Sequence, residues 1–566
     1  MNENPGAKLV EAKLHEFRKM NDAGSADGHA MAASDPKIQR EPTEQMYDHD
    51  GKDAASLSHT NAPATADGSG SHDVEAESRI EYLVAWQDEA SDPGNPKNWA
   101  MRRKAKALVG MSMFVFISVF AVSLIAPALP AISSELHIEQ PAVQEMVLSI
   151  FLLSFAFGPL VASPLSETFG RMRVIQSWNL LYTVFNAVCG ASQSKEALIV
   201  LRFISGFFAS ATLGIGGGTI SDLFRSKDRG KGVAIYSWCS VAGPLFGVIL
   251  GGFIAKYTTW RWAFFSTSIL SACIQLIGLY MLEETYPPLL LRRRKWTIIK
   301  ETGDTRYYTH DDHLDHVTAR VLSQNLVRPF KLLMTQPIVQ VMALYNAFLY
   351  GNTYIFFANF VNIFTDRYHQ SVQIAGLNYV SIATSSCLAT VIYSMTIDRI
   401  YRALSNWNGG QGKPEFRIPV MAPGTLLLGI GLFWYGWSAE AVLHWIMPNI
   451  GCGLFVAGAT VCTSSVNAYI VDTYGQYSAS AIAAISILRC LAGFTFPMFA
   501  PYMYGRLGYG WAATVLGFIA LSIGFPVLGL LWKFGLYLRQ RSPYSSAEKA
   551  PETRHVGAIL ASNSTC

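Results

Sequence analysis

The chain has 566 residues, of which 51% are hydrophobic and only 15% are charged, and its formal net charge is +4. Soluble domains carry about a quarter charged residues, so this deficit indicates that much of the surface faces lipid. The small net charge, and basic residues that lie beside apolar stretches rather than in one patch, exclude a nucleic-acid-binding protein.

The first part of the chain differs from the rest. Residues 1–100 contain no apolar window and are rich in Asp, Glu, Ser, Gly and Ala, as in DGSGSHDVEAESRIEY (67–82). Such a composition buries too little apolar surface to fold alone, so we expect a disordered tail. No charged start followed by an apolar run is present, and we therefore expect no cleavable signal peptide.

Apolar stretches of about 18–25 residues recur from Lys104 onward, and each is long enough to cross a bilayer as a helix. Twelve such stretches are predicted, so the expected fold class is all-α and polytopic. They cover 106–131, 144–164, 174–192, 197–221, 233–255, 263–282, 338–362, 373–397, 419–439, 443–470, 478–502 and 512–536.

The longest gap between stretches divides the chain into halves. It spans 283–337 and separates a predicted six-helix bundle at 104–282 from a second at 338–536. Lys and Arg concentrate in alternate loops, and this bias places the long loop in the cytoplasm. The tails 1–100 and 537–566 are then both cytoplasmic.

Several local motifs occur in order along these stretches. They are DPGNPKNW (92–99), GPLVASPLSETFGRMR (158–173), LRFISGFFASATLGIGGGTISDLF (201–224), WRWAFF (260–265), EETYPP (283–288) and RPFKLLMTQP (328–337). Together they resemble the major facilitator superfamily, and more narrowly the fungal twelve-spanner drug:proton antiporters, over residues 86–541. The resemblance implies two six-helix bundles that rock about a central site.

The loop after the second stretch resembles a family motif that latches helix ends on the cytoplasmic side. Glu167 stands at its acidic place, and Gly170 and Arg171 stand at its end. Asp398 and Arg399 occupy the equivalent place in the second half. A glycine permits a tight turn there, and a carboxylate is favoured near a helix N-terminus. A solvated surface ion pair is the alternative to a latch.

Proton coupling is expected to involve charged groups inside the membrane, which are costly there and usually face a partner or a cavity. Arg202 matches the arginine of the fourth span that is associated with coupling in the family. Glu145, at the outer end of the second span, is the nearest carboxylate, and we hypothesise that the two form a polar pair. The alternatives are an arginine that holds backbone carbonyls and a carboxylate that is merely interfacial.

The fifth stretch carries small residues that let helices approach closely, together with a proline that kinks the span. The residues of this motif are Gly243, Pro244, Gly247, Gly251 and Gly252. Val248 stands where the antiporter signature has a second proline, so the match to that signature is partial. Plain helix packing is the alternative function of the glycines.

The substrate is expected to contact aromatic and amide side chains of the seventh stretch, ALYNAFLYGNTYIFFANF (343–360). The candidate binding residues are Tyr345, Asn346, Asn352, Tyr350 and Tyr354, with Arg489 and Asn467 from later stretches. No fixed charge is adjacent to the tyrosines in sequence, which favours a neutral or weakly charged, lipophilic, aromatic substrate. Arg489 has helix packing as its alternative role.

These features predict a secondary transporter that exports drugs or secondary metabolites by proton antiport. A proton-coupled uptake symporter and a transport-inactive sensor of the same fold are the alternatives. No phosphate-binding loop or catalytic constellation is present, so an enzyme or an ATP-driven pump is not expected. We expect no cofactor or metal, a small-molecule substrate and the lipid bilayer as partners, and a monomer in the plasma membrane, with the vacuolar membrane as the alternative.

Overall fold

The structure of the chain is a computed structural model that describes residues 82–86, 91–225, 229–309 and 318–544. Within these ranges the chain is helical apart from turns and one isolated bridge between Leu83 and Tyr308. The predicted all-α fold class is confirmed. Most of the predicted N-terminal tail, and the C-terminal tail beyond residue 544, lie outside the described residues.

The helices of the first half follow one another through short connections. They are α3 (Met101–Ser123), α4 (Leu129–Glu135), α5 (Pro141–Phe169), α6 (Arg171–Gly190), α7 (Lys195–Ala209), α8 (Ala211–Leu223), α9 (Arg229–Tyr257) and α10 (Arg261–Met281). Local chemistry sets several of their ends. The Ser194 side chain accepts a hydrogen bond from the Ala197 amide at the start of α7, as an N-cap does. Gly170, with φ of 99°, separates α5 from α6.

Two helices connect the halves, and six more form the second half. The connecting helices are α11 (Pro287–Thr302) and α12 (Thr318–Thr335). The second half contains α13 (Pro337–Asp366), α14 (Val372–Leu377), α15 (Tyr379–Trp407), α16 (Met421–Glu440), α17 (Ile446–Tyr474) and α18 (Ser478–Gln540). Gly508 has a non-helical conformation within the 63 residues of α18 and divides it into two helical stretches.

Nine helical stretches in the described part of the chain are long and apolar enough to cross a membrane. A tenth is obtained when the end of α12 and α13, which meet at a bend of 96°, count as one span. Every predicted stretch overlaps a helix, but α6 is not among the nine, and α18 covers two predictions. The multi-pass character is confirmed, whereas the number twelve stays a prediction.

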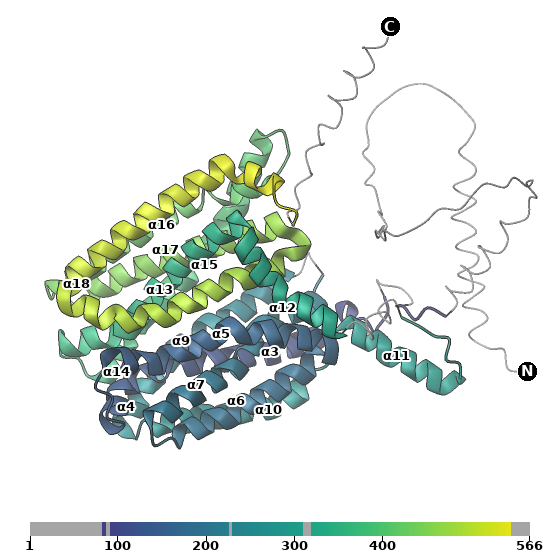
Figure 1. The fold of residues 1–566 in the computed structure, drawn as a ribbon, viewed down its shortest axis with the longest axis horizontal. Coiled ribbons are helices and arrows are strands. Elements are labelled where there is room, and N and C mark those ends of the chain that lie inside the picture. The colour runs from purple at the N-terminus through teal and green to yellow at the C-terminus, as the bar shows by residue number, and fades with distance from the viewer. Residues whose placement is uncertain (1–81, 87–90, 226–228, 310–317, 545–566) are drawn as a thin grey trace, which may run out of the picture. The chain divides into compact units, whose positions relative to one another are not determined.

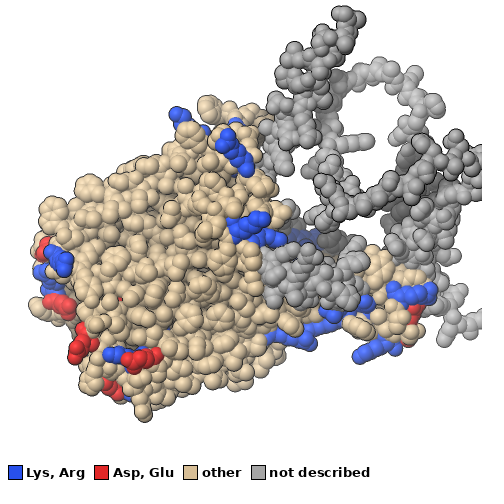
Figure 2. Space-filling view, in the orientation of Figure 1, with Lys and Arg blue, Asp and Glu red and all other residues tan. Residues whose placement is uncertain are grey.

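Each half has its own apolar core. One core joins side chains of α3 to α10 together with Cys490 of α18, and the other joins side chains of α12 to α18 together with Val248 of α9. Figure 1 shows the two sets of helices side by side, with α11 extending away from them. On the visible face the charged side chains gather at the two ends of the helices and leave an uncharged belt between them (Figure 2). This belt is the surface expected to face hydrocarbon.

Candidate functional site

Three of the predicted binding residues come together between α13 and α18. Tyr350 and Tyr354 lie four residues apart and therefore on one face of α13. Their ring centroids are 4.8 Å apart, and their hydroxyl oxygens are 3.4 Å apart. The guanidinium carbon of Arg489 lies 4.8 Å from the centroid of the Tyr350 ring. We call these three residues the aromatic cluster.

The aromatic cluster lies where the two halves meet. A Cβ atom on Gly493 of α18 would be 3.0 Å from Tyr350 and 3.5 Å from Leu152 of α5, so the three helices converge there. Tyr354 packs against the core of the first half, and Cys490 of α18 belongs to that core. The cluster is thus built on the second half and faces the first.

The charge at the aromatic cluster differs from the sequence-based expectation. Arg489 places a fixed positive charge against Tyr350, although no charged residue is near the tyrosines in sequence. Its Nε is buried and has no hydrogen-bond partner among the described residues. A guanidinium in such surroundings needs an acceptor. The cluster can therefore bind an aromatic ring together with an oxygen that accepts a hydrogen bond.

The other predicted binding residues lie apart from the aromatic cluster. Tyr345 is buried and its hydroxyl lies 3.4 Å from Thr425 Oγ1 of α16, inside the second half. Asn346 accepts a hydrogen bond from the Thr463 hydroxyl at 3.4 Å. Asn467 of α17 is half-buried. None of the structural contacts assigns a substrate to these residues, so their role stays a prediction.

Asn352 of α13 has a side-chain amide whose hydrogen-bonding groups lack partners. It is fully buried, and neither its amide nitrogen nor its amide oxygen has a hydrogen-bond partner in the described structure. A buried amide without partners is costly unless water or a ligand satisfies it. Asn352 therefore remains a candidate contact for a polar substrate group.

Arg202 and Glu145 are both buried, but they are not paired. Arg202 is fully buried in α7, where its Nε donates to the Val147 carbonyl at 3.4 Å and its guanidinium carbon lies 4.4 Å from the Phe151 ring centroid. Both of its Nη atoms lack hydrogen-bond partners among the described residues. Glu145 in α5 also has an unpartnered Oε2 atom. The structure thus holds two separate polar groups near the start of α5.

The loop between α5 and α6 forms a connected network around Arg171. Arg171 is buried, and its Nε donates to Asp222 of α8 at 3.3 Å. Glu284 accepts hydrogen bonds from the backbone amides of Arg171 at 3.0 Å and Met172 at 3.3 Å. Glu167 is exposed, and its carboxylate lies 3.8 Å from Arg171. The structure therefore links this loop to α8 and to the segment after α10.

Asp222 and Glu284 are the residues of this network that the motif comparison did not assign. They lie 51 and 113 residues from Arg171 in sequence, so spacing alone could not connect them with it. A signal did exist, because Asp222 ends the fourth apolar stretch and Glu284 lies within EETYPP. Acidic residues at the ends of spans, on the same side as the loop, are where partners for a loop arginine are expected.

In the second half, the place equivalent to the α5–α6 loop also contains ion pairs, but the arginine that joins them is Arg417. Arg417, before α16, contacts Asp398 of α15 at 3.2 Å and Asp472 of α17 at 2.9 Å. Arg399 is exposed and has no ion pair in the described structure. Asp398 therefore takes part in a charged contact between helices, and its partner is Arg417 rather than a neighbour in sequence.

The glycines of α9 mark two packing surfaces. Cβ atoms on Gly243 and Gly247 would meet residues of α3, and one on Gly251 would meet Leu124, directly after α3; at Gly247 the nearest atom is the Phe120 carbonyl oxygen, 2.7 Å away. Gly252 instead faces α14 of the second half, with the Val372 carbonyl oxygen 3.2 Å from such a Cβ. Pro244 lies inside the helix. Helix packing accounts for these glycines, and Gly252 adds a contact between halves.

Val248 also belongs to this contact between halves. It is buried in the core of the second half, and its carbonyl oxygen would be 3.3 Å from a Cβ on Gly376 of α14. The residue that departs from the antiporter signature is therefore placed at the boundary of the two bundles. A valine keeps the backbone hydrogen bond of α9 that a proline at this position would remove.

The chain is similar in sequence to a known family of membrane proteins and to several of its members. The family model of the Major Facilitator Superfamily matches residues 111–497. The chain is 44% identical to the efflux pump vrtL of Penicillium aethiopicum over 82% of this chain and 92% of that protein. It is 34% identical to the efflux pump radE of Floropilus chiversii over 92% of this chain and 96% of that protein.

A solved structure shares the fold. The xylose transporter XylE from E. coli, in a partially occluded inward open conformation, has a TM-score of 0.55 and 16% sequence identity, covering 76% of this chain and 99% of that one. The family match spans more than half of the sequence, and the two bundles of apolar helices agree with it. The chain therefore belongs to the major facilitator superfamily and is a multi-pass membrane transporter, not an enzyme.

Proposed function

We propose that this transporter exports small, lipophilic aromatic molecules by proton antiport, through alternating access of a central site. The observation that carries the proposal is the aromatic cluster, which lies between the two halves of the protein. A site in this place changes its exposure when the halves move relative to each other.

The chemistry of the aromatic cluster supports an aromatic substrate with an oxygen acceptor. Tyrosine rings favour offset or edge contacts with another ring. The guanidinium of Arg489 favours a phenolate, carboxylate or carbonyl oxygen over a cationic group. The substrate class is thus a neutral or weakly acidic aromatic compound, and Asn352 supplies an amide for a further polar group.

The proton step of the proposal involves Glu145 and Arg202. Each is buried and has at least one unpartnered polar atom among the described residues. Ionisable groups within membrane helices commonly belong to proton pathways. The two residues act as separate groups, one on α5 and one on α7, and proton entry at Glu145 is coupled to substrate release. The proton gradient is the energy source in this scheme, and no cofactor takes part.

Outward direction is supported by relatives that are named efflux pumps, including vrtL and radE. The plasma membrane, with both termini in the cytoplasm, is the proposed location, since the loops with most Lys and Arg are then cytoplasmic. The monomer is the proposed working unit, because each half supplies residues around the central site within one chain.

Transport by purified protein in proteoliposomes with an imposed pH gradient tests the proposal. Fluorescein serves as an aromatic acid, ethidium as an aromatic cation and glucose as a non-aromatic compound. We expect gradient-dependent movement of fluorescein and little movement of the other two. Movement of fluorescein that is equal with and without the gradient contradicts antiport, and preference for glucose contradicts the proposed substrate class.

Variants connect this transport to the aromatic cluster. Tyr350→Ala is expected to reduce fluorescein transport by about tenfold, which corresponds to about 1.4 kcal/mol of lost interaction. Tyr502→Ala is the matched control, because Tyr502 is an exposed tyrosine on α18. Equal losses in both variants contradict a binding role for the cluster. Direction is tested in cells, where loss of an exporter raises internal fluorescein.

A further inference from the structure

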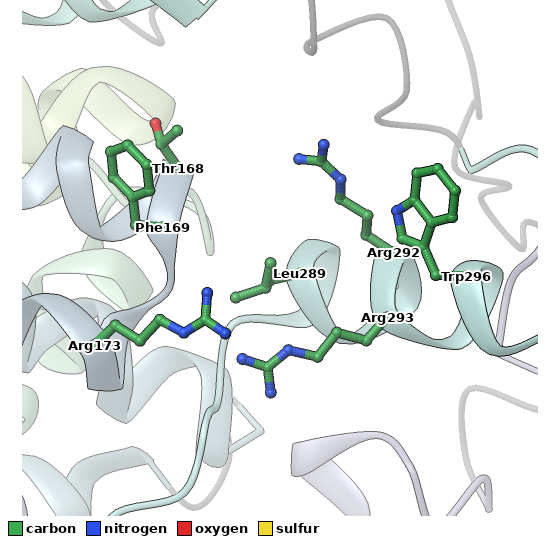
Figure 3. A pocket seen from close by; sticks show the side chains of 7 residues that line it. All are labelled: Thr168, Phe169, Arg173, Leu289, Arg292, Arg293 and Trp296. Atoms are coloured by element: carbon green, nitrogen blue, oxygen red, sulfur yellow. The ribbon is translucent and has the colours of Figure 1, made fainter.

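A cavity lies where the helices α5 and α6 meet α11. It is lined by Thr168, Phe169, Arg173, Leu289, Arg292, Arg293 and Trp296. Figure 3 shows the guanidinium groups of Arg173 and Arg293 extending toward each other beside Leu289, with Trp296 and Arg292 farther along α11. We call this the basic cavity. It is remote from the aromatic cluster, since it lies at the helix ends.

Two arginines of the basic cavity carry positive charge that no ion pair among the described residues neutralises. Arg173 and Arg293 are both exposed, and neither has an ion-pair partner in the described part of the chain. Like charges that approach each other are unfavourable unless water screens them or an anion bridges them. Two guanidinium groups that face one space match the planar, multidentate contacts that a phosphate accepts.

The remaining walls of the basic cavity are apolar and exposed. Phe169 is 55% exposed at the end of α5, and Trp296 is 53% exposed on α11. Leu289 lies beside the Arg173 and Arg293 guanidinium groups (Figure 3). Apolar side chains in this setting do not stabilise a free inorganic anion. They do suit a molecule that joins an anionic group to hydrocarbon, and tryptophan is enriched where membranes meet water.

The position of the basic cavity identifies the source of such a molecule. The membrane-crossing helix α5 ends at Phe169, so the cavity lies at the level where its span leaves the hydrocarbon. α11 contributes Arg292 and Arg293 to the cavity and carries Arg294 and Lys295 directly after them. Clusters of basic residues directly beside membrane spans on the cytoplasmic side attract anionic lipids.

We propose that the basic cavity binds the headgroup of an anionic phospholipid, with the phosphate between Arg173 and Arg293 and the glycerol region against Phe169 and Leu289. The bound lipid connects the α5–α6 loop to α11. It thereby stabilises the start of the segment that joins the two halves. The inference depends neither on the transported substrate nor on the direction of transport.

Binding of short-chain lipids to the full-length protein in detergent tests the site. Dioctanoyl phosphatidylserine is titrated against dioctanoyl phosphatidylcholine and inorganic phosphate, and binding is followed by thermophoresis. We expect saturable binding of the phosphatidylserine at least about tenfold tighter than that of the other two probes. Equal binding of inorganic phosphate would assign the cavity to a free anion, and equal binding of phosphatidylcholine would exclude recognition of the charge.

A charge-matched pair of double variants locates the binding. The variant Arg173→Gln/Arg293→Gln is expected to bind phosphatidylserine about thirtyfold more weakly, as for two basic side chains removed from an anionic surface. The control Lys300→Gln/Lys533→Gln removes the same charge from exposed positions outside the cavity. Both variants are first compared by their thermal unfolding in lipid-free detergent. Equal weakening in folded variants overturns the proposal, because it shows dependence on net charge alone.

Discussion

Two arginines inside the helical region have different surroundings, and the difference separates their roles. Arg489 lies against Tyr350 at the boundary between the halves. Arg202 is fully enclosed within the first half, against Phe151 and Phe264. A ligand that enters between the halves can reach Arg489 without unfolding of the protein. Arg202 can respond to such a ligand only through movements of the helices that enclose it. Arg489 is therefore a candidate for substrate contact and Arg202 for coupling.

Replacement of Arg202 distinguishes a role in proton coupling from a role in stabilising the fold. Arg202→Leu is expected to leave the thermal unfolding midpoint unchanged or higher, because an apolar side chain in place of a poorly paired buried charge is often neutral or stabilising. Gradient-driven transport is expected to fall by at least about tenfold. Arg202→Lys, which keeps the charge, should retain more transport than the leucine variant. A leucine variant with full pH-driven transport contradicts a coupling role.

Two acidic residues near Arg171, Glu284 and Glu167, differ in burial and in the number of hydrogen bonds that they accept. Glu284 is buried and accepts the amides of Arg171, Met172, Thr285 and Tyr286. Glu284→Ala is expected to lower the free energy of unfolding by about 1–3 kcal/mol, since these amides lose their acceptor. Glu167→Ala should cost only about 0–1 kcal/mol, because the Glu167 carboxylate is exposed and lies 3.8 Å from Arg171. Denaturant unfolding in detergent measures both, and a larger loss for the Glu167 variant would reverse the assignment.

At the level of elements, the close approach of α9 to α3 depends on glycine. A Cβ atom at Gly251 would collide with the Leu124 carbonyl oxygen, which is backbone and cannot rotate away. Gly251→Ala is therefore expected to lower the free energy of unfolding by about 1–3 kcal/mol through overpacking. The change is measured from the denaturant dependence of tryptophan fluorescence.

The control for this substitution is a helical glycine in open space. Gly529 of α18 has no atom within 4 Å of a Cβ position. Gly529→Ala is expected to stabilise the helix by up to about 1 kcal/mol, because alanine restricts the unfolded chain more than glycine does. If the Gly251 and Gly529 variants have equal stability, the α9–α3 contact is not what selects glycine.

The extent to which sequence predicted the elements depends on what hydropathy can measure. The length of an apolar run predicted helices such as α5, α13 and α17, because a bilayer requires about 20 apolar residues in a row. The gap between the predicted stretches 478–502 and 512–536 also contains the non-helical Gly508 of α18. Hydropathy does not detect shorter breaks, since the predicted stretch 197–221 continues across Ser210, which separates α7 from α8. It also undervalues α6, which carries Arg171, Arg173 and Asn179, and whose Asn179 amide donates to Gln275 of α10 at 2.7 Å.

The candidate site was predictable only in part, for a similar reason. An apolar helix buried on several sides has no sequence period that identifies its functional face. The sequence therefore indicates the tyrosines of α13 only as a group, and the structure separates Tyr350 and Tyr354, at the boundary between halves, from Tyr345, which contacts Thr425. Contacts between helices far apart in sequence, such as Arg489 of α18 with Tyr350 of α13, join positions that no local motif connects.

At the scale of the whole molecule, the proposed cycle requires the two halves to separate and close at their contacts. One contact lies between α9 and α14, where a Cβ at Gly252 would be 3.4 Å from the Gln373 Cα. The Lys256 ammonium also donates to the Gln373 side chain at 3.4 Å. These residues lie at the predicted outer ends of the helices, so alternating access requires this contact to open when the outer side is exposed.

A reversible crosslink between α9 and α14 tests that requirement. The short Cβ–Cα separation at Gly252 and Gln373 is compatible with the Cα separation of about 4.4–6.8 Å that disulfides need. In the double variant Gly252→Cys/Gln373→Cys we expect oxidant to stop transport and reductant to restore it, because a covalent bond holds the halves together at this end. Each single-cysteine variant, treated with the same oxidant, controls for reaction of the eight native cysteines. Full transport by protein whose crosslink is confirmed by mass spectrometry would show that α9 and α14 stay together throughout the cycle, and alternating access through this contact would be excluded.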